Sequence, residues 1–110
     1  MDSNEVLSAF SALSQQTRLD VFRILIKAGS EGLPAGEIGG KLNVRQNTMS
    51  ANLAVLLNSG LVRNERQGRT IRYFADFDAM RGLLAFLMED CCGGRPELCQ
   101  PVIDEIACAS

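Results

Sequence analysis

Residues 35–75, AGEIGGKLNVRQNTMSANLAVLLNSGLVRNERQGRTIRYFA, decide the fold of this chain. Apolar residues at helical spacing predict a short helix over Ala35–Leu42. A tight break at Asn43–Val44 precedes a longer helix over Gln46–Ser59, and Gly60 is a favourable residue to end it. Two helices joined in this way predict a helix-turn-helix.

The hydrophobic period changes after Gly60 from about 3.6 residues to about 2. This change predicts two short strands, Leu61–Arg66 and Thr70–Ala75, joined by a hairpin at Gln67-Gly68-Arg69. A basic hairpin directly after the longer helix is typical of a winged helix-turn-helix, in which the second helix lies in a DNA major groove.

Two helices are expected before this stretch. Apolar residues at helical spacing predict a helix over residues 3–14. A second helix is expected over Thr17–Ala28, with Ser14 as its cap and Gly29 as its end. Its apolar residues cover more than one face, which predicts a central position in the fold.

The last predicted helix starts near Asp78, its expected cap, and runs to about Glu89. It is apolar nearly all round and must be covered on two sides. A chain of 110 residues has little left to cover its outer side. We therefore expect a homodimer through the N-terminal and C-terminal helices, and the alternative is burial within one subunit. The apolar residues of this helix are Met80, Leu83, Leu84, Phe86, Leu87 and Met88.

The predicted order of elements is α-α-α-α-β-β-α, a mainly α single domain over residues 1–110 with a β-hairpin wing. Gly93-Gly94-Arg95-Pro96 is expected to break the last helix. The tail, at about residues 89–110, is expected to add one or two helical turns from Gln100 onward.

The charge of the chain is unevenly distributed. The net charge is −2, but residues 45–72 hold five arginines against one glutamate, and residues 73–110 hold two arginines against seven acids. A basic band of this kind is the electrostatic footprint of double-stranded DNA binding, and the alternative is a solvated charged face. The expected DNA-binding residues are Arg45, Gln46, Asn47, Thr48, Ser50 and Asn52 on the longer helix, and Arg66, Arg69 and Arg72 at the hairpin.

All four cysteines, Cys91, Cys92, Cys99 and Cys108, lie in the last twenty residues. This clustering argues against disulfides that staple the whole fold and favours free thiols in a reducing cytoplasm. The chain has no apolar run long enough for a membrane span and no apparent export signal, so a cytoplasmic protein without a membrane partner is expected. It also has no histidine, the commonest metal ligand and general base.

From Ala12 to about Leu87, the chain resembles winged-helix repressors of the ArsR/SmtB type. The resemblance rests on LSQQTRLDVFRIL at residues 13–25, NTMSANLAVLLNSGLV at 47–62 and RQGRTIRYF at 66–74. It implies a dimeric repressor that binds an operator near its own promoter and is released by a metal or metalloid. The chain departs from the family at Asn52, where the family often has histidine.

The resemblance also indicates where an ion could bind. Zinc sensors of this type use histidine and carboxylates on the last helix, and this chain has no histidine. The best-known arsenic sensors carry Cys-x-Cys on the first helix of the helix-turn-helix, which here is LPAGEIGGKL without cysteine. The remaining candidate, CCGGRPELC at residues 91–99, is similar to the arsenic-responsive members whose thiols lie near the C-terminus.

Thiolate chemistry agrees with this resemblance, because soft thiolates select soft ions and trivalent arsenic takes three sulfur ligands. We expect As(III) as the inducer, with Sb(III) or methylated trivalent arsenic as alternatives, bound by Cys91, Cys92 and Cys99. Cys108 could replace Cys99, and each site could lie within one subunit or across two. The rival interpretations are a four-cysteine zinc site and thiols without a ligand.

Other functions compete with an arsenic-responsive repressor. An enzyme such as an arsenate reductase is not expected, because the thiols lack C-x-x-C spacing and an adjacent base. A repressor on the same scaffold could respond to another thiophilic metal, to an organic ligand, or to thiol oxidation through a Cys99–Cys108 disulfide. A DNA-binding protein without a ligand is the remaining alternative.

Overall fold

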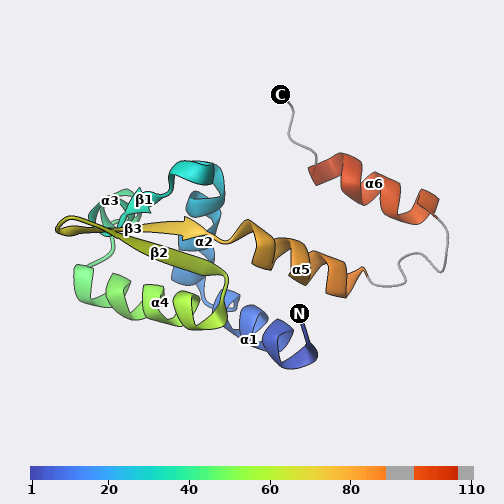
Figure 1. Cartoon of the computed structure of the whole chain (residues 1–110), viewed down its shortest axis with the longest axis horizontal. Coiled ribbons are helices and arrows are strands. Elements are labelled where there is room, and N and C mark those ends of the chain that lie inside the picture. The colour runs from blue at the N-terminus through green and yellow to red at the C-terminus, as the bar shows by residue number, and fades with distance from the viewer. Residues whose placement is uncertain (89–95, 107–110) are drawn as a thin grey trace.

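The computed structural model describes residues 1–88 and 96–106, which form a mainly helical fold with a small antiparallel sheet (Figure 1). This architecture confirms the predicted winged helix-turn-helix. Both helices of the motif and the second wing strand have the predicted bounds. The elements are α1 (Ser3–Leu13), α2 (Gln16–Ala28), η1 (Gly29–Glu31), β1 (Leu33–Pro34), α3 (Ala35–Leu42), α4 (Gln46–Ser59), β2 (Val62–Gln67), β3 (Thr70–Ala75), α5 (Phe77–Leu87) and α6 (Pro96–Ile106).

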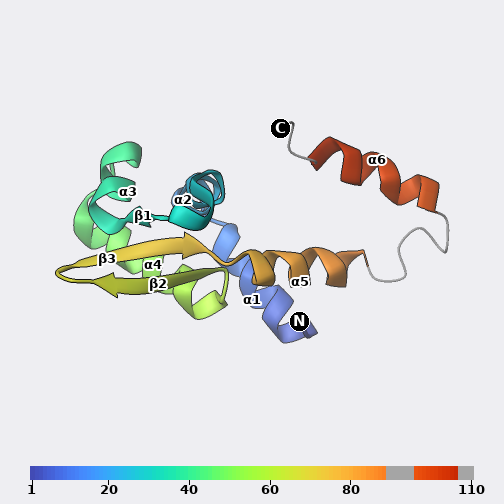
Figure 2. The same ribbon diagram turned by 45° about the horizontal axis from the view of Figure 1, so that its top comes forward.

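The two ends of the molecule, which measures 49 × 34 × 24 Å, carry different elements (Figures 1 and 2). The start of α4 and the tip of the β2–β3 hairpin lie at one end. Helices α5 and α6 lie at the opposite end, together with the start of α1. The segments predicted to bind DNA are therefore separated in space from those predicted to form a dimer.

The sheet has the strand order β1-β3-β2, with β3 in the centre and both pairings antiparallel. The edge strand β1 pairs Leu33 with Tyr73 and was not predicted. Pro34 suits this edge, because a proline has no amide hydrogen to donate to a further strand. In the wing, Gly68 has a φ of +65°, which suits the first position of a two-residue hairpin loop.

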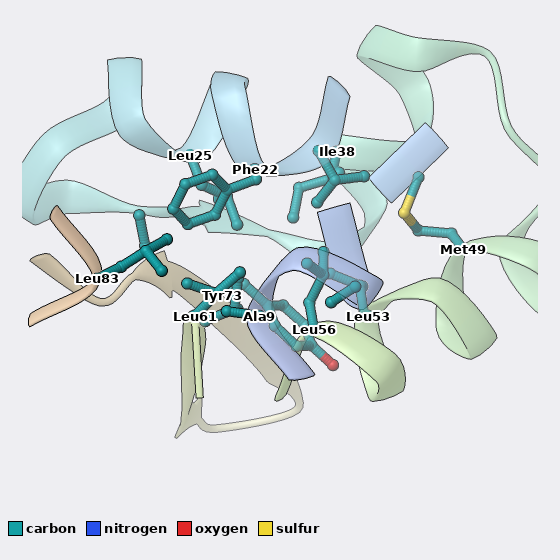
Figure 3. Close-up of a cluster of buried hydrophobic side chains, with 14 of the residues drawn as sticks. Ala9, Phe22, Leu25, Ile38, Met49, Leu53, Leu56, Leu61, Tyr73 and Leu83 are labelled. Atoms are coloured by element: carbon teal, nitrogen blue, oxygen red, sulfur yellow. The ribbon is translucent and has the colours of Figure 1, made fainter. Parts of the chain in front are cut away.

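The hydrophobic core lies where α1, α2, α3 and α4 meet the sheet (Figure 3). Ala9 and Ala12 of α1 are buried, and their small side chains allow this helix to approach α2 and α4 closely. Leu83 joins α5 to the same cluster. The fully buried large side chains are Val21, Leu25, Ile38, Leu53, Leu56 and Leu61.

Two predicted helix caps are wrong by one or two positions. The N-cap of α2 is Gln15 rather than Ser14, and its side chain accepts a hydrogen bond from the Arg18 amide at 2.8 Å. The N-cap of α5 is Asp76 rather than Asp78. Neighbouring polar side chains compete for the same first-turn amides, so spacing alone does not select the cap.

Helix α6 is longer than predicted, because its 11 residues begin at Pro96 rather than near Gln100. Proline suits the first helical position, where an amide hydrogen would have no partner within the helix. The expectation that Pro96 belongs to the helix break is therefore wrong. The other residues of the predicted break, 93–95, lie outside the described residues, as does Glu89, the expected end of the preceding helix. No helix within residues 1–88 and 96–106 combines the length and the hydropathy that a membrane span needs.

Apolar side chains are exposed on α5 and α1, away from the sheet. Leu83 is the one buried residue of α5. Within residues 1–88 and 96–106 the outer side of α5 is only partly covered, with α6 across an apolar groove from it, and the homodimer stays a prediction. The exposed large apolar residues are Leu7 and Phe10 of α1 and Phe77, Leu84 and Leu87 of α5, with Met88 directly after it.

We expect Gly32→Ala to destabilise the protein by about 3 kcal/mol or more. A Cβ at this position would lie 2.3 Å from the Tyr73 carbonyl oxygen and 2.5 Å from the Phe74 ring, and φ is +62°. The control is Gly36→Ala in α3, where a Cβ meets nothing within 4 Å and stability should rise by about 0.5–1 kcal/mol. Urea unfolding measures both changes. Equal stability of the two variants would contradict the packing of Gly32 against β3.

Candidate nucleic-acid interface

The first turns of α4 lie at the same end of the molecule as the wing tip (Figure 1). Most of their polar side chains are exposed. Arg45 is the N-cap, has an extended backbone and makes no side-chain capping hydrogen bond. An N-terminus without such a cap favours an anionic group, such as a DNA phosphate. The predicted DNA-binding residues that are exposed here are Arg45, Gln46, Asn47, Thr48 and Ser50.

The turn between α3 and α4 fixes the direction of the recognition helix α4. Asn43 adopts the left-handed conformation with a φ of +54°, and the Val44 amide donates to the Gly39 carbonyl at 3.1 Å. A Cβ on Gly39 would lie 3.3 Å from the Val44 carbonyl oxygen, so glycine lets the turn close tightly. Met49 and Leu53 are buried on the inner face of α4. The opposite face is consequently held toward solvent.

Asn52 does not belong to the exposed face, and the expectation that it does is wrong. Its side chain is only 7% exposed, and its Oδ1 accepts a hydrogen bond from Arg18 Nη1 at 3.2 Å. Position 52 follows the buried Met49 by three residues and therefore lies on the same side of the helix. Arg18 was not predicted as a functional residue, because nothing in local spacing links two residues 34 positions apart.

The wing arginines divide into two kinds. Arg66 and Arg69 are exposed beside the hairpin loop. Arg72 is half-buried and donates to Gln67 Oε1 at 3.1 Å, to the Glu31 carbonyl at 2.9 Å and to the next carbonyl along the chain at 3.2 Å. Arg72 therefore ties the hairpin to the turn before β1, and DNA contact by this residue stays a prediction.

A further arginine of the basic band also has a partner within the fold. The guanidinium of Arg63 lies 4.3 Å from the centre of the Phe74 ring, a cation–π contact between adjacent strands. Arg63 is itself exposed, as are Arg45 at the start of α4 and Arg66 and Arg69 beside the wing loop.

The cysteine cluster lies largely outside the described residues, which include Cys99 but not Cys91, Cys92 or Cys108. Cys99 is only 6% exposed on α6, and its sulfur is in a disulfide bond. It lines an apolar groove of about 530 Å³ between α5 and α6. Residues 1–88 and 96–106 hold no group of three potential ligands among His, Cys, Asp and Glu. The metal-ligand set stays a prediction.

Comparison with known proteins identifies the class of this fold. Residues 13–65 match the family described as a helix-turn-helix domain. Over 95 residues, the chain is 34% identical to an uncharacterized HTH-type transcriptional regulator of Bacillus subtilis, YbzH, covering 76% of this chain and 95% of YbzH. An ArsR-like transcriptional regulator from Rhodococcus sp. RHA1 is 27% identical with a TM-score of 0.70, over 97% of this chain and 96% of the other. The chain belongs to the ArsR-type helix-turn-helix transcriptional regulators.

Two other solved structures resemble this ArsR-type regulator. One is a homodimeric winged helix-turn-helix DNA-binding domain from Mycobacterium bovis, which is 26% identical with a TM-score of 0.65, over 93% of this chain and 81% of the other. The other is the antimony-specific transcriptional repressor AntR, which is 27% identical with a TM-score of 0.61, over 77% of this chain and 76% of the other.

The fold of an ArsR-type regulator implies DNA binding through the helix-turn-helix. This agrees with the expected operator DNA and with the exposed polar start of α4. Relatives of the chain are named as transcriptional regulators, a class of DNA-binding proteins rather than enzymes.

We expect Arg69→Ala to weaken DNA binding without changing stability, because Arg69 is exposed at the wing loop. Loss of one phosphate contact should lower the slope of log affinity against log salt by about 1. Fluorescence anisotropy on a labelled duplex, repeated over a salt series, measures this slope.

Arg72→Ala is the matched comparison, since Arg72 hydrogen-bonds within the fold. It should lower the free energy of unfolding by about 1–3 kcal/mol. A normal unfolding free energy for Arg72→Ala, together with a reduced salt slope, would reassign Arg72 to DNA contact.

Proposed function

We propose that this protein is a repressor whose dimer binds operator DNA without ligand and releases it when trivalent arsenic or antimony binds its C-terminal thiolates. The observation that carries the proposal is the placement of all four cysteines between residues 91 and 108. Cys99, which lies among the described residues, is on α6, at the opposite end of the molecule from the start of α4 (Figure 1). Ligand binding there would act on DNA through the fold rather than by blocking the recognition helix.

The chemistry of the available ligands favours a soft ion. The chain has no histidine, whereas thiolates bind thiophilic ions such as trivalent arsenic and antimony. The similar repressor AntR is named as antimony-specific, which supports a metalloid inducer. Cys91, Cys92 and Cys99 supply three sulfurs within nine residues.

A homodimer through α1 and α5 accounts for the apolar side chains that the chain leaves exposed. Leu84 is 41% exposed, and Leu7 and Phe10 of α1 are also exposed. Helix α5 and the start of α1 lie at the same end of the molecule (Figures 1 and 2). A similar domain from Mycobacterium bovis is described as homodimeric, which supports this assembly.

Release of DNA follows from the geometry of such a dimer. Two recognition helices bind two half-sites only when the subunits hold them about one DNA turn apart, or a multiple of it. A ligand bound beside the α1–α5 seam can favour a dimer with a different separation. A difference of about 1–3 kcal/mol between the two states is typical of this coupling.

Thiol oxidation is the second candidate signal, favoured by the disulfide at Cys99. A cysteine in a disulfide has no thiolate to offer a metal, so As(III) binding at this residue requires its reduction. A redox-responsive repressor would lose DNA on oxidation and would not respond to arsenite.

The dimer predicts that Leu84→Glu yields a monomer, because a charge would then lie in an apolar seam. Sedimentation velocity should show half the molecular mass, and affinity for operator DNA should fall at least about tenfold. Leu19→Glu is the control, since Leu19 is 38% exposed on α2, outside the proposed seam. A dimeric Leu84→Glu variant would exclude this seam.

The ligand site predicts that arsenite releases DNA under reducing conditions. Cys91→Ser, Cys92→Ser and Cys99→Ser should each keep DNA affinity and lose the response, because thiolates bind As(III) and hydroxyls do not. Cys108→Ser is the control and should keep it. Anisotropy of labelled DNA from upstream of the protein's own gene, at fixed salt, reports release.

Zinc and peroxide titrations separate the candidate signals. Release by peroxide but not by arsenite would establish the redox alternative, and release by zinc alone would indicate a zinc site. A normal arsenite response in Cys91→Ser and Cys92→Ser would show that these residues are not the ligands.

A further inference from the structure

Arg18 links three helices through one guanidinium group. Its Nε donates to the Ala12 carbonyl of α1 at 2.7 Å, and its Nη1 donates to Asn52 Oδ1 of α4 at 3.2 Å. Arg18 itself is in the first turn of α2. The N-terminal helix of the proposed dimer seam is therefore hydrogen-bonded, through one side chain, to the recognition helix.

Both acceptors need this partner. Ala12 lies in the last turn of α1, where the carbonyl groups accept no hydrogen bond from an amide of the same helix. A positive charge is also favourable at this end of a helix. Asn52 is the one buried amide or charged side chain within residues 1–88 and 96–106. A buried amide without a hydrogen bond is unfavourable, so the contact with Arg18 is favoured over its loss.

The apolar packing between α1 and α4 is less specific than these hydrogen bonds. Ala9 and Ala12 form the buried surface of α1 near α4, together with Val6. Methyl groups attract without a directional preference, whereas a planar guanidinium fixes the direction of each of its bonds. Arg18 therefore adds two directional bonds to the apolar packing of α1 against α4.

We propose that Arg18 and Asn52 are positioning residues that set the angle between α1 and the recognition helix, and thereby the separation of the two recognition helices in the dimer. Asn52 acts from inside the fold and does not read a base. The proposal rests on the dimeric DNA binding of the proposed function but not on its arsenic ligand.

The test compares operator DNA with one and with two half-sites, using an operator selected by the wild-type full-length chain from random duplexes. Asn52→Leu removes the acceptor at similar volume, and Asn52→Asp keeps it. Asn58→Leu is the matched control at an exposed position of α4. Arg18→Lys is a second disrupting variant, because one ammonium cannot reproduce the planar fork.

We expect Asn52→Leu and Arg18→Lys to bind the single half-site within about twofold of wild type and the two-half-site operator about tenfold more weakly. They should also discriminate less between operators whose half-site spacing differs by one base pair. Asn52→Asp should restore wild-type affinity and spacing preference, and Asn58→Leu should change neither.

An equal loss on both duplexes would overturn the proposal, because it would assign Asn52 to base contact or to folding alone. Unchanged binding by both disrupting variants would overturn it as well. Thermal unfolding of each variant identifies any that fail to fold. If Asn52→Leu does not fold, the result for Arg18→Lys decides the test. A wild-type chain with no preference for two half-sites would instead remove the dimeric DNA binding on which the proposal rests.

Discussion

The burial of one face of α4 is the constraint on which the rest of the structure depends. Leu53 and Leu56 lie in the core among residues of every neighbouring helix and of the sheet (Figure 3). Removing each of these side chains from water contributes about 1.5–3 kcal/mol, so the helix is not free to roll about its axis. The opposite, apolar face of α4 must stay in the core, so the polar residues between Gln46 and Ser50 face solvent. The DNA-binding surface follows from packing rather than from contacts among its own residues.

The same packing places the helix-turn-helix and the proposed dimer surface at opposite ends of one small domain. The wing and α4 lie at one end, and α5 and α6 lie at the other, so any signal between them passes through the body of the fold. The buried cluster in that body is apolar, and apolar contacts are non-directional. Arg18 contributes directional hydrogen bonds to α1 and α4, which distinguishes it from the surrounding core.

Sequence patterns predicted the helix-turn-helix well because its signals are local. Helices α3 and α4 have their apolar residues at regular spacing and are bounded by Asn43 and Gly60, so their predicted bounds are confirmed. Strand β1 was missed because two residues carry no periodicity, and its pairing with β3 is long-range. The start of α6 was missed because Pro96 was interpreted as a helix breaker, whereas it is the first residue of the helix. A second proline, Pro101, lies inside the same helix. The roles of Arg72 and Asn52 depend on partners 41 and 34 residues away, which spacing cannot indicate.

Some arginines of the basic band have partners within the fold, and others are exposed at the DNA-binding end. This division affects how strongly the proposed ligand must act to release DNA. Arg63 and Arg72 have partners within the fold, and Arg45, Arg66 and Arg69 are exposed at the start of α4 and beside the wing loop. Fewer phosphate contacts give a smaller sequence-independent affinity and a shallower salt dependence. Residues 73–110, with seven acids against two arginines, add no attraction for DNA. In the proposed dimer, operator affinity would depend more strongly on both recognition helices reaching their half-sites together. A coupling of about 1–3 kcal/mol, or roughly 5–150-fold, is then sufficient to shift operator occupancy.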